Sequence, residues 1–311
     1  MKLLGLGCGR RMGNSEILMK EALMAAEATG DIEVELIHLH DLKIKPCTGC
    51  EKCTMSMSKG GTGECFQKDD MRFLKQKFTE CDGLIISAPV FELRPPGLYC
   101  IMNDRFLGFG PQYLMSVFQR PKRAGALISV GGSDWVQLAL PQMNLAMFML
   151  NFKVVDQFQE MWTGRPGHTL FHEEALARAN QLGKNVAEAM KKPPAEMAFK
   201  GDDPGICPFC HSNLLLTRGK NVVECPICAI RGDLALKDGE ITVNWSAEDI
   251  RMIKWEPLGM GEHFKHIMER HVYFEENKES LKPRLDKYRV YKSYSLPPKA
   301  EEAESQVQEE G

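Results

Sequence analysis

The chain has 311 residues, of which 43% are hydrophobic and 26% charged, and its formal net charge is −3. These values are ordinary for a globular protein and leave room for one large domain and a smaller one. The charge gives no reason to expect a nucleic-acid partner, and the lack of an 18-residue apolar run argues against a membrane protein. The N-terminus lacks the long apolar segment of a signal peptide, so we expect a cytoplasmic protein.

Short apolar runs alternate with stretches of helical periodicity in the first 190 or so residues. The expected strands are Lys2–Leu6, Val34–Leu39, Leu84–Ser87, Ala124–Val130 and Phe152–Phe158. The expected helices are Asn14–Ala28, Phe73–Glu80, Leu138–Leu150 and Glu173–Met190. This alternation predicts an α/β domain with a doubly wound, five-stranded parallel sheet, and such sheets bind ligands at the carboxyl ends of their strands.

The composition divides the chain into five segments. We expect the α/β domain at 1–192 and a linker at 193–205, because paired lysines and prolines end the last helix of the domain. A cysteine-rich module follows at 206–245 and a helical extension at 246–296. The stretch 297–311 is acidic and poor in apolar residues, so we expect a disordered tail.

A glycine-rich loop, Gly7–Ser15, separates the first strand from the first helix. Glycines let the backbone approach an anion closely, and the following helix offers free N–H groups and the positive end of its dipole. Arg10, Asn14 and Ser15 add further donors. The loop is neither a Walker loop nor a dinucleotide fingerprint. It indicates a phosphate site, although a strand–helix turn without a ligand fits the loop alone equally well.

Three motifs in chain order resemble those of the NADPH-dependent FMN reductase and iron–sulfur flavoprotein family. The first is this loop, and the second is Ser87-Ala88-Pro89-Val90-Phe91, which continues through Pro96-Gly97 to Asp104-Arg105. The third is Ser129-Val130-Gly131-Gly132 after the fourth strand. The likeness covers roughly 1–190 and implies a flavodoxin-like fold that binds FMN.

The resemblance also implies which residues bind the cofactor. Those expected on the phosphate side are Gly7, Cys8, Arg10, Gly13, Asn14 and Ser15. Those expected beside the isoalloxazine ring are Pro89, Val90, Phe91, Glu92, Gly131 and Gly132. Two positions depart from the family's pattern: Cys8 stands for the usual serine, and Glu92-Leu93-Arg94 replaces a stretch of smaller residues. These departures predict an altered choice of substrate.

Four cysteines follow the second strand: Cys47, Cys50 and Cys53 in a C-x-x-C-x-x-C pattern, and Cys65 further on. Four thiolates on one loop can bind a [4Fe–4S] cluster, and the resembling flavoproteins carry a compact motif at this place. The long gap before Cys65 costs little entropy. Zinc and free thiols are the alternatives, and we favour the cluster.

A second set, Cys207, Cys210, Cys225 and Cys228, consists of two C-x-x-C knuckles separated by a strand–turn–strand pattern. This spacing predicts a tetrahedral four-thiolate site and resembles a zinc ribbon. Iron, as in rubredoxin-like modules, is the alternative. We favour structural Zn²⁺, because rubredoxin knuckles place glycine after the second cysteine of each pair, where this chain has His211 and Ala229.

These features together predict an FMN-dependent oxidoreductase in which the cofactor does the chemistry and a cluster relays single electrons. The electron donor would be NAD(P)H or ferredoxin, and the resemblance implies a homodimer or homotetramer. Two rivals remain at this point. One is a non-catalytic electron carrier or scaffold that docks a partner enzyme, and the other is a zinc-ribbon interaction protein on a degenerate flavodoxin-like fold.

Overall fold

The computed structural model describes residues 1–291. The acidic tail expected at 297–311 lies outside these residues, as does the end of the expected helical extension. The chain divides into two compact units after Phe264. Among residues 1–291, no helix is both long and apolar enough to cross a bilayer.

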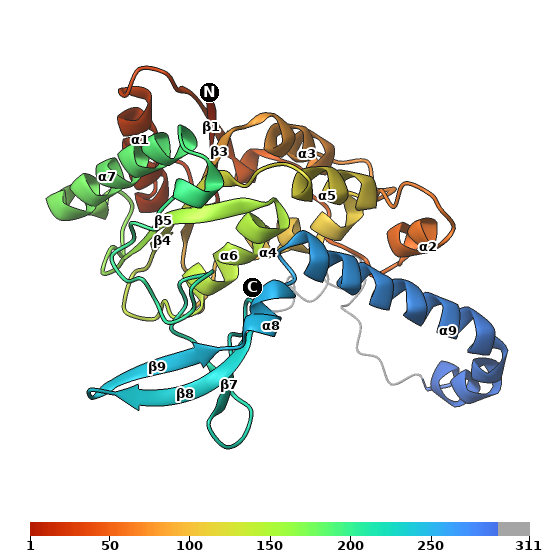
Figure 1. The fold of residues 1–311 in the computed structure, drawn as a ribbon. Coiled ribbons are helices and arrows are strands. Elements are labelled where there is room, and N and C mark those ends of the chain that lie inside the picture. The colour runs from red at the N-terminus through yellow and green to blue at the C-terminus, as the bar shows by residue number, and fades with distance from the viewer. Residues whose placement is uncertain (292–311) are drawn as a thin grey trace, which may run out of the picture. The chain divides into compact units, whose positions relative to one another are not determined.

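A five-stranded parallel sheet forms the centre of the first unit (Figure 1). Its strands are β1 Lys2–Gly7, β2 Glu33–His38, β3 Gly83–Pro89, β4 Arg123–Val130 and β5 Phe152–Glu160. The strand order β2-β1-β3-β4-β5 is that of flavodoxin-like folds, with the switch point between β1 and β3. The five strands predicted from the apolar runs are therefore confirmed.

Helices cover both faces of this sheet. They are α1 Asn14–Glu27, α3 Met71–Glu80, α4 Gly97–Asp104, α5 Pro111–Phe118, α6 Ala139–Met149 and α7 Glu173–Met190. A further helix, α2 Lys52–Ser58, lies on the connection between β2 and α3 and contributes to neither core (Figure 1). Short 3₁₀ turns are η1 Leu39–Asp41, η2 Phe106–Gly108, η3 His168–Phe171 and η4 Pro194–Glu196. The short helices α2, α4 and α5 were not predicted from the sequence.

The two faces have separate cores. Helices α1 and α7 lie side by side on one face and enclose Leu3, Leu18 and Leu182, all of which are buried (Figure 1). Helices α3 to α6 contribute to the core of the other face, which includes Leu4 and Phe78. Successive residues of β1 thus bury opposite faces, and this explains why the strands read as unbroken apolar runs.

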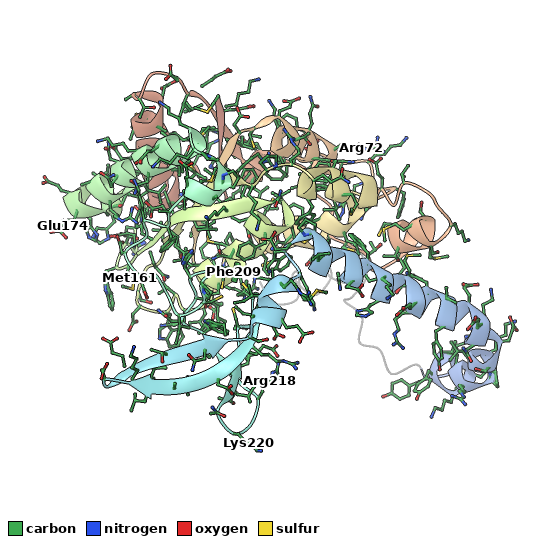
Figure 2. The ribbon with its side chains drawn as sticks, viewed as in Figure 1. Arg72, Met161, Glu174, Phe209, Arg218 and Lys220 are labelled. Atoms are coloured by element: carbon green, nitrogen blue, oxygen red, sulfur yellow. The ribbon has the colours of Figure 1, made fainter. Side chains whose placement is uncertain are left out.

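A second sheet lies in the cysteine-rich module. Its strands are β6 Leu216–Thr217, β7 Val222–Glu224, β8 Arg231–Lys237 and β9 Glu240–Trp245, all antiparallel. Lys220 lies in the β6–β7 turn (Figure 2). The β8–β9 turn has Asp238 and Gly239 at positive φ, the pattern of a type I′ hairpin. This second hairpin was missed at the sequence level, although Asp-Gly is its usual signal.

Two helices follow, α8 Ala247–Arg251 and α9 Pro257–Arg289. Ser246 caps α8, because its Oγ accepts a hydrogen bond from the Asp249 N–H at 3.2 Å. Trp255, between the two helices, stacks on Phe148 of α6 with a centroid distance of 5.5 Å. Phe148 also belongs to the apolar cluster around the four cysteines of the module. The module is therefore packed against α6 of the α/β sheet.

Candidate functional site

A cavity of about 530 Å³ lies at the carboxyl ends of β3, β4 and β5 and at the start of α1. This is the edge where open parallel sheets bind ligands. Eight of the twelve residues predicted to bind the cofactor line it: Arg10, Gly13, Asn14, Ser15, Pro89, Val90, Phe91 and Gly132. The cavity thus brings together the three motifs that lie far apart in the sequence.

The glycine-rich loop forms the anion-binding end of this cavity. A Cβ on Gly9 would lie 2.3 Å from Ser15 Oγ and 3.0 Å from Pro89 Cδ, and one on Gly13 would lie 2.8 Å from Arg10 Cγ. Only glycine allows so close a turn. Helix α1 has no side-chain cap, so its first N–H groups are available to a ligand. With Arg10 beside them, these donors fit the phosphate of FMN.

Asn14 lines the cavity, and its side chain also makes hydrogen bonds within the protein. Its side-chain amide donates hydrogen bonds to the carbonyl oxygens of Thr163 at 2.7 Å and Arg165 at 2.8 Å. Its Oδ1 accepts a bond from the Thr169 N–H at 3.2 Å. The amide therefore ties the start of α1 to the segment after β5, and that segment lines the cavity.

Six further residues line the cavity: Val130, which belongs to the third motif, and His40, Thr163, Gly164, Arg165 and Pro166, which the sequence motifs did not indicate. Four of them form one segment directly after β5. Its position at the carboxyl end of a predicted strand, together with its glycine, proline and arginine, was the signal that could have found it. Arg165 adds a second guanidinium group to the lining, which strengthens the fit to an anionic ligand.

The flavin end begins at Pro89, the last residue of β3, and at Val90, whose N–H donates to the Val130 carbonyl at 2.8 Å. A tight turn follows, in which Phe91 and Arg94 exchange backbone hydrogen bonds of 2.8 and 3.2 Å. Glu92 and Leu93 have φ of 49° and 70°, so the turn is of type I′ without the usual glycine. Phe91 is exposed at the cavity, whereas Glu92 is not among the lining residues.

Three predicted residues lie behind the cavity rather than in its lining. Gly131 is structural, because a Cβ would meet Val136 Cγ1 at 2.4 Å, and its N–H donates to the Glu160 carbonyl at 2.8 Å. Cys8 is fully buried, and burial raises the pKa of its thiol far above the ordinary value. Gly7 ends β1 beside Cys8. These residues shape the loops around the cavity and are not among its lining residues.

A buried acid–histidine pair lies beneath the loop. Glu16 Oε2 and His38 Nε2 are 3.9 Å apart, and the Glu16 carboxylate also accepts the Met12 N–H and pairs with Lys20 at 3.0 Å. Burial raises the pKa of Glu16, but its hydrogen bonds and the Lys20 charge outweigh burial and leave that pKa below the ordinary value. Burial lowers the pKa of His38, opposed in part by Glu16. The pair is thus an ionised carboxylate and a neutral imidazole.

The second cysteine set converges as predicted. The thiols of Cys207, Cys210, Cys225 and Cys228 are buried, and their sulfur atoms all lie within 4.8 Å of one another. Within residues 1–291 no other group of three or more Cys, His, Asp or Glu ligands comes as close. His211 is not part of this group: its Nδ1 forms a hydrogen bond with the Pro204 carbonyl at 2.9 Å, and its ring stacks on Phe199 with a centroid distance of 3.5 Å. The set fits a single four-coordinate metal ion with no open position.

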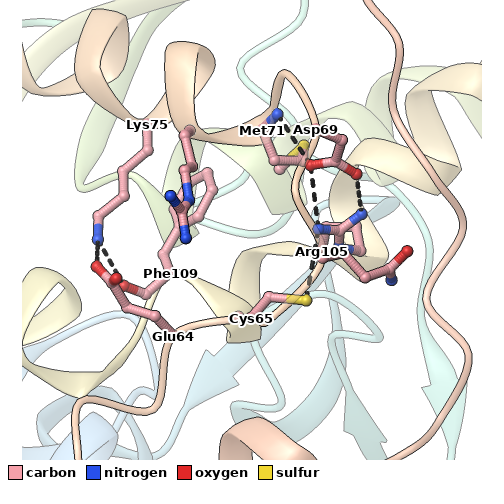
Figure 3. Close-up of a pocket in the computed structure, with 10 residues that line it drawn as sticks. Glu64, Cys65, Asp69, Met71, Lys75, Arg105 and Phe109 are labelled. Atoms are coloured by element: carbon pink, nitrogen blue, oxygen red, sulfur yellow. Dashed lines mark hydrogen bonds and ion pairs between the residues drawn. The ribbon is translucent and has the colours of Figure 1, made fainter.

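The first cysteine set is more open. Cys47 and Cys50 are exposed, Cys53 and Cys65 are half-buried, and none forms a disulfide. The four do not converge to the distance of a single-ion site. Burial raises the pKa of Cys53, and the charges of Cys65 and Cys47 raise it further, so these thiols interact. Cys65 lines a second cavity of about 290 Å³, where its sulfur accepts a hydrogen bond from Arg105 (Figure 3).

The strand order, the anion-binding loop and the cavity at the carboxyl edge define a flavodoxin-like α/β protein with a site for a flavin phosphate. Residues 1–164 match the family model of NADPH-dependent FMN reductase, and the chain belongs to this family. It is accordingly an FMN-dependent oxidoreductase.

Three similar proteins extend this comparison. Flavone synthase cfoJ of Aspergillus candidus is 29% identical over 76% of this chain and 79% of its own length. An iron–sulfur flavoprotein of Methanocaldococcus jannaschii is 30% identical over 61% of this chain and 98% of its own. A solved structure of a flavone reductase is 28% identical, with a TM-score of 0.78 over 96% of this chain and 100% of that protein. The last likeness extends beyond the α/β domain.

Proposed function

We propose that this protein takes electrons from NAD(P)H through FMN and delivers them to a flat conjugated ketone of the flavone class. The observation that carries the proposal is the cavity at the carboxyl edge of the sheet, which joins an anion-binding loop to an apolar wall at Pro89, Val90 and Phe91. FMN supplies the hydride and single-electron chemistry when it is bound. The protein's own residues bind, orient and shield it.

Two observations support the substrate class. The relatives with the names flavone synthase and flavone reductase match most of this chain. In addition, Phe91, Trp135 and Trp162 are exposed on loops whose neighbouring residues line the cavity. Exposed aromatic rings beside a flavin site can stack on a planar substrate, and such pairs contribute about 0.5–1.5 kcal/mol each.

Steady-state turnover tests this proposal. Oxidation of NADH and of NADPH is followed with a flavone, a quinone or free FMN as the acceptor. In a parallel assay, reduced ferredoxin replaces the nicotinamide as the electron donor. We expect NAD(P)H oxidation that depends on the flavone. The variant Arg10→Gln, in the cavity lining, is expected to weaken FMN binding. Arg11→Gln is the matched control, because Arg11 pairs with Asp41 instead. Absence of turnover with every acceptor contradicts the proposal.

We also propose a zinc ion bound by Cys207, Cys210, Cys225 and Cys228. A closed, buried four-thiolate set leaves no position for a substrate, so this ion has a structural role. It would stabilise the fold of the module, because binding free energy at such sites is folding free energy. Metal analysis of the purified protein tests this, and iron in place of zinc at these cysteines contradicts it.

For the first cysteine set we propose a [4Fe–4S] cluster on Cys47, Cys50, Cys53 and Cys65. The donor chemistry fits, because four thiols without disulfides lie on the connection between β2 and α3. Relatives with the name iron–sulfur flavoprotein match 61% of this chain. Anaerobic purification followed by iron and acid-labile sulfide analysis tests the cluster, and protein free of both contradicts it.

We further propose that the protein is a homodimer or homotetramer. The exposed rings of Phe91, Trp135, Trp162 and Phe171 lie on the loops and 3₁₀ turn that follow β3, β4 and β5. Such an apolar rim supports contact with a second copy of the chain. Light scattering in solution measures the mass, and a monomer at micromolar concentration contradicts this proposal.

A further inference from the structure

Arg105 lies between Asp69 and Cys65, the last cysteine of the loop (Figure 3). It caps the C-terminal end of α4, and its side chain is only 2% exposed. Its Nη1 donates to the Lys45 carbonyl at 2.5 Å, two residues before the first cysteine of the loop. Its Nη2 donates to Cys65 Sγ at 3.5 Å, at the last cysteine. One guanidinium group therefore bridges both arms of the loop.

Asp69 holds this guanidinium group in place. Its carboxylate is 1% exposed and accepts bonds from Arg105 Nη1 at 2.6 Å and Nη2 at 3.3 Å. The same carboxylate accepts the N–H groups of Lys45 at 3.0 Å and Met71 at 3.3 Å. The pair is therefore connected to the loop through backbone groups as well as through sulfur.

The backbone fixes Cys65 at the same place. Its N–H donates to the Gly108 carbonyl at 2.8 Å, and a Cβ on Gly108 would lie 2.7 Å from Cys65 Cβ. Within the described residues, Arg105 Nε is buried without a hydrogen-bond partner. Burial of an ion pair is expensive and adds little stability by itself. The Arg105–Asp69 pair is buried at this cost, and its Nη2 donates to the sulfur of Cys65. We infer that the pair has a role beyond folding.

We propose that Arg105, held by Asp69, positions Cys65 as the fourth ligand of the iron–sulfur cluster and raises the reduction potential of that cluster. This inference rests on the cluster advanced under the proposed function. Hydrogen bonds to ligand sulfur and nearby positive charge favour the reduced, more negative state of an iron–sulfur centre. Arg105 supplies both from one side chain. It is a positioning residue and takes no part in the reaction itself.

The test compares Arg105→Gln and Arg105→Lys with the matched control Arg178→Gln. Arg178 forms a similar ion pair with the fully buried Asp156, at 2.5 Å, between α7 and β5. Mutation of a residue that holds a metal ligand in place typically lowers metal affinity by about 10- to 100-fold. We therefore expect Arg105→Gln to lose its cluster at a chelator concentration about 10- to 100-fold lower than the wild type does. The control keeps wild-type retention.

The reduction potential distinguishes positioning from simple folding. An EPR-monitored redox titration is expected to show a more negative potential in Arg105→Gln, a smaller shift in Arg105→Lys, which keeps the charge, and none in Arg178→Gln. An unchanged potential in both Arg105 variants overturns the inference. Arg105→Lys keeps the test decisive if the glutamine variant does not fold.

Failure of the cluster proposal gives a different result. Wild-type protein without iron and sulfide contradicts the cluster, whatever the variants do. In that case, hydrogen exchange of residues 43–66 in the metal-free protein still tests the bridge. Faster exchange in Arg105→Gln than in Arg178→Gln supports it, and equal exchange overturns it.

Discussion

The variant Asn14→Ala tests how the cavity is held together. The side chain makes three hydrogen bonds that connect the start of α1 to the segment Thr163–Thr169. A hydrogen bond contributes about 0.5–1.5 kcal/mol, and the bond to the Arg165 carbonyl is exposed, so we take about 0.7–1 kcal/mol for each of the three bonds. The expected loss is about 2–3 kcal/mol in the free energy of unfolding.

Two assays measure this effect. For a domain of this size, 1 kcal/mol shifts Tm by about 2–4 °C, so the variant should melt roughly 4–12 °C lower. Release of the segment also removes one wall of the cavity, and FMN titration should give a Kd at least about tenfold higher, which corresponds to about 1.4 kcal/mol.

The control for this variant is Asn180→Ala. Asn180 makes one hydrogen bond, from α7 to Glu21 of α1, at 2.9 Å. We expect a loss of about 1 kcal/mol or less and an unchanged Kd for FMN. If Asn14→Ala raises Kd while Tm and the hydrogen exchange of residues 163–169 stay at wild-type values, the amide contacts the phosphate directly. That result would refute the role of Asn14 as a tie between α1 and the segment after β5.

Three further variants test other parts of the structure. Gly9→Ala forces a methyl group against Ser15 and Pro89, which should lower the free energy of unfolding by about 1–3 kcal/mol and weaken FMN binding. The control is Gly97→Ala, where a Cβ meets no atom within 4 Å, and it should leave both quantities unchanged. The pKa of buried His38 is below its ordinary value, so the free energy of unfolding is highest above about pH 6.5 and falls as the pH drops toward the folded-state pKa. His38→Leu should make the free energy of unfolding, measured in urea melts at pH 5–7, less dependent on pH. An equal pH dependence in the variant and the wild type would contradict the assignment. Cys225→Ser removes one thiolate, so bound zinc and Tm should both fall, and retention of zinc by mass spectrometry would exclude this cysteine as a ligand.

The parts of the fold that the sequence predicts are those with a strong local pattern. The strands are buried on both faces, so their apolar runs are continuous, and their parallel arrangement follows from the alternation with helices. The two C-x-x-C knuckles predict a four-thiolate set because their spacing alone brings the sulfurs together. The glycine-rich loop is also mainly local, since Gly9 meets Ser15 and Gly13 meets Arg10, and only the contact of Gly9 with Pro89 is distant in the sequence.

The features that the sequence did not predict depend on long-range contacts. The partners of Asn14 lie about 150 residues away, so no local pattern assigns them. The bridge from Arg105 to Cys65 and Lys45 joins segments separated by helices that were themselves missed. The turn at Glu92 and Leu93 adopts left-handed φ without glycine or asparagine, and its Leu93 carbonyl accepts the Leu138 N–H at 3.0 Å. Tertiary contacts override the usual turn preference at this position.

The central claim is that the cavity at the carboxyl edge of the sheet binds FMN. Titration of the flavin-free protein with FMN, followed by flavin fluorescence, tests this claim most directly. We predict saturable quenching at stoichiometric FMN in the wild type and in Arg11→Gln, and a clearly higher Kd in Arg10→Gln. Protein that does not quench FMN fluorescence, or that binds FMN equally well in both variants, would contradict it.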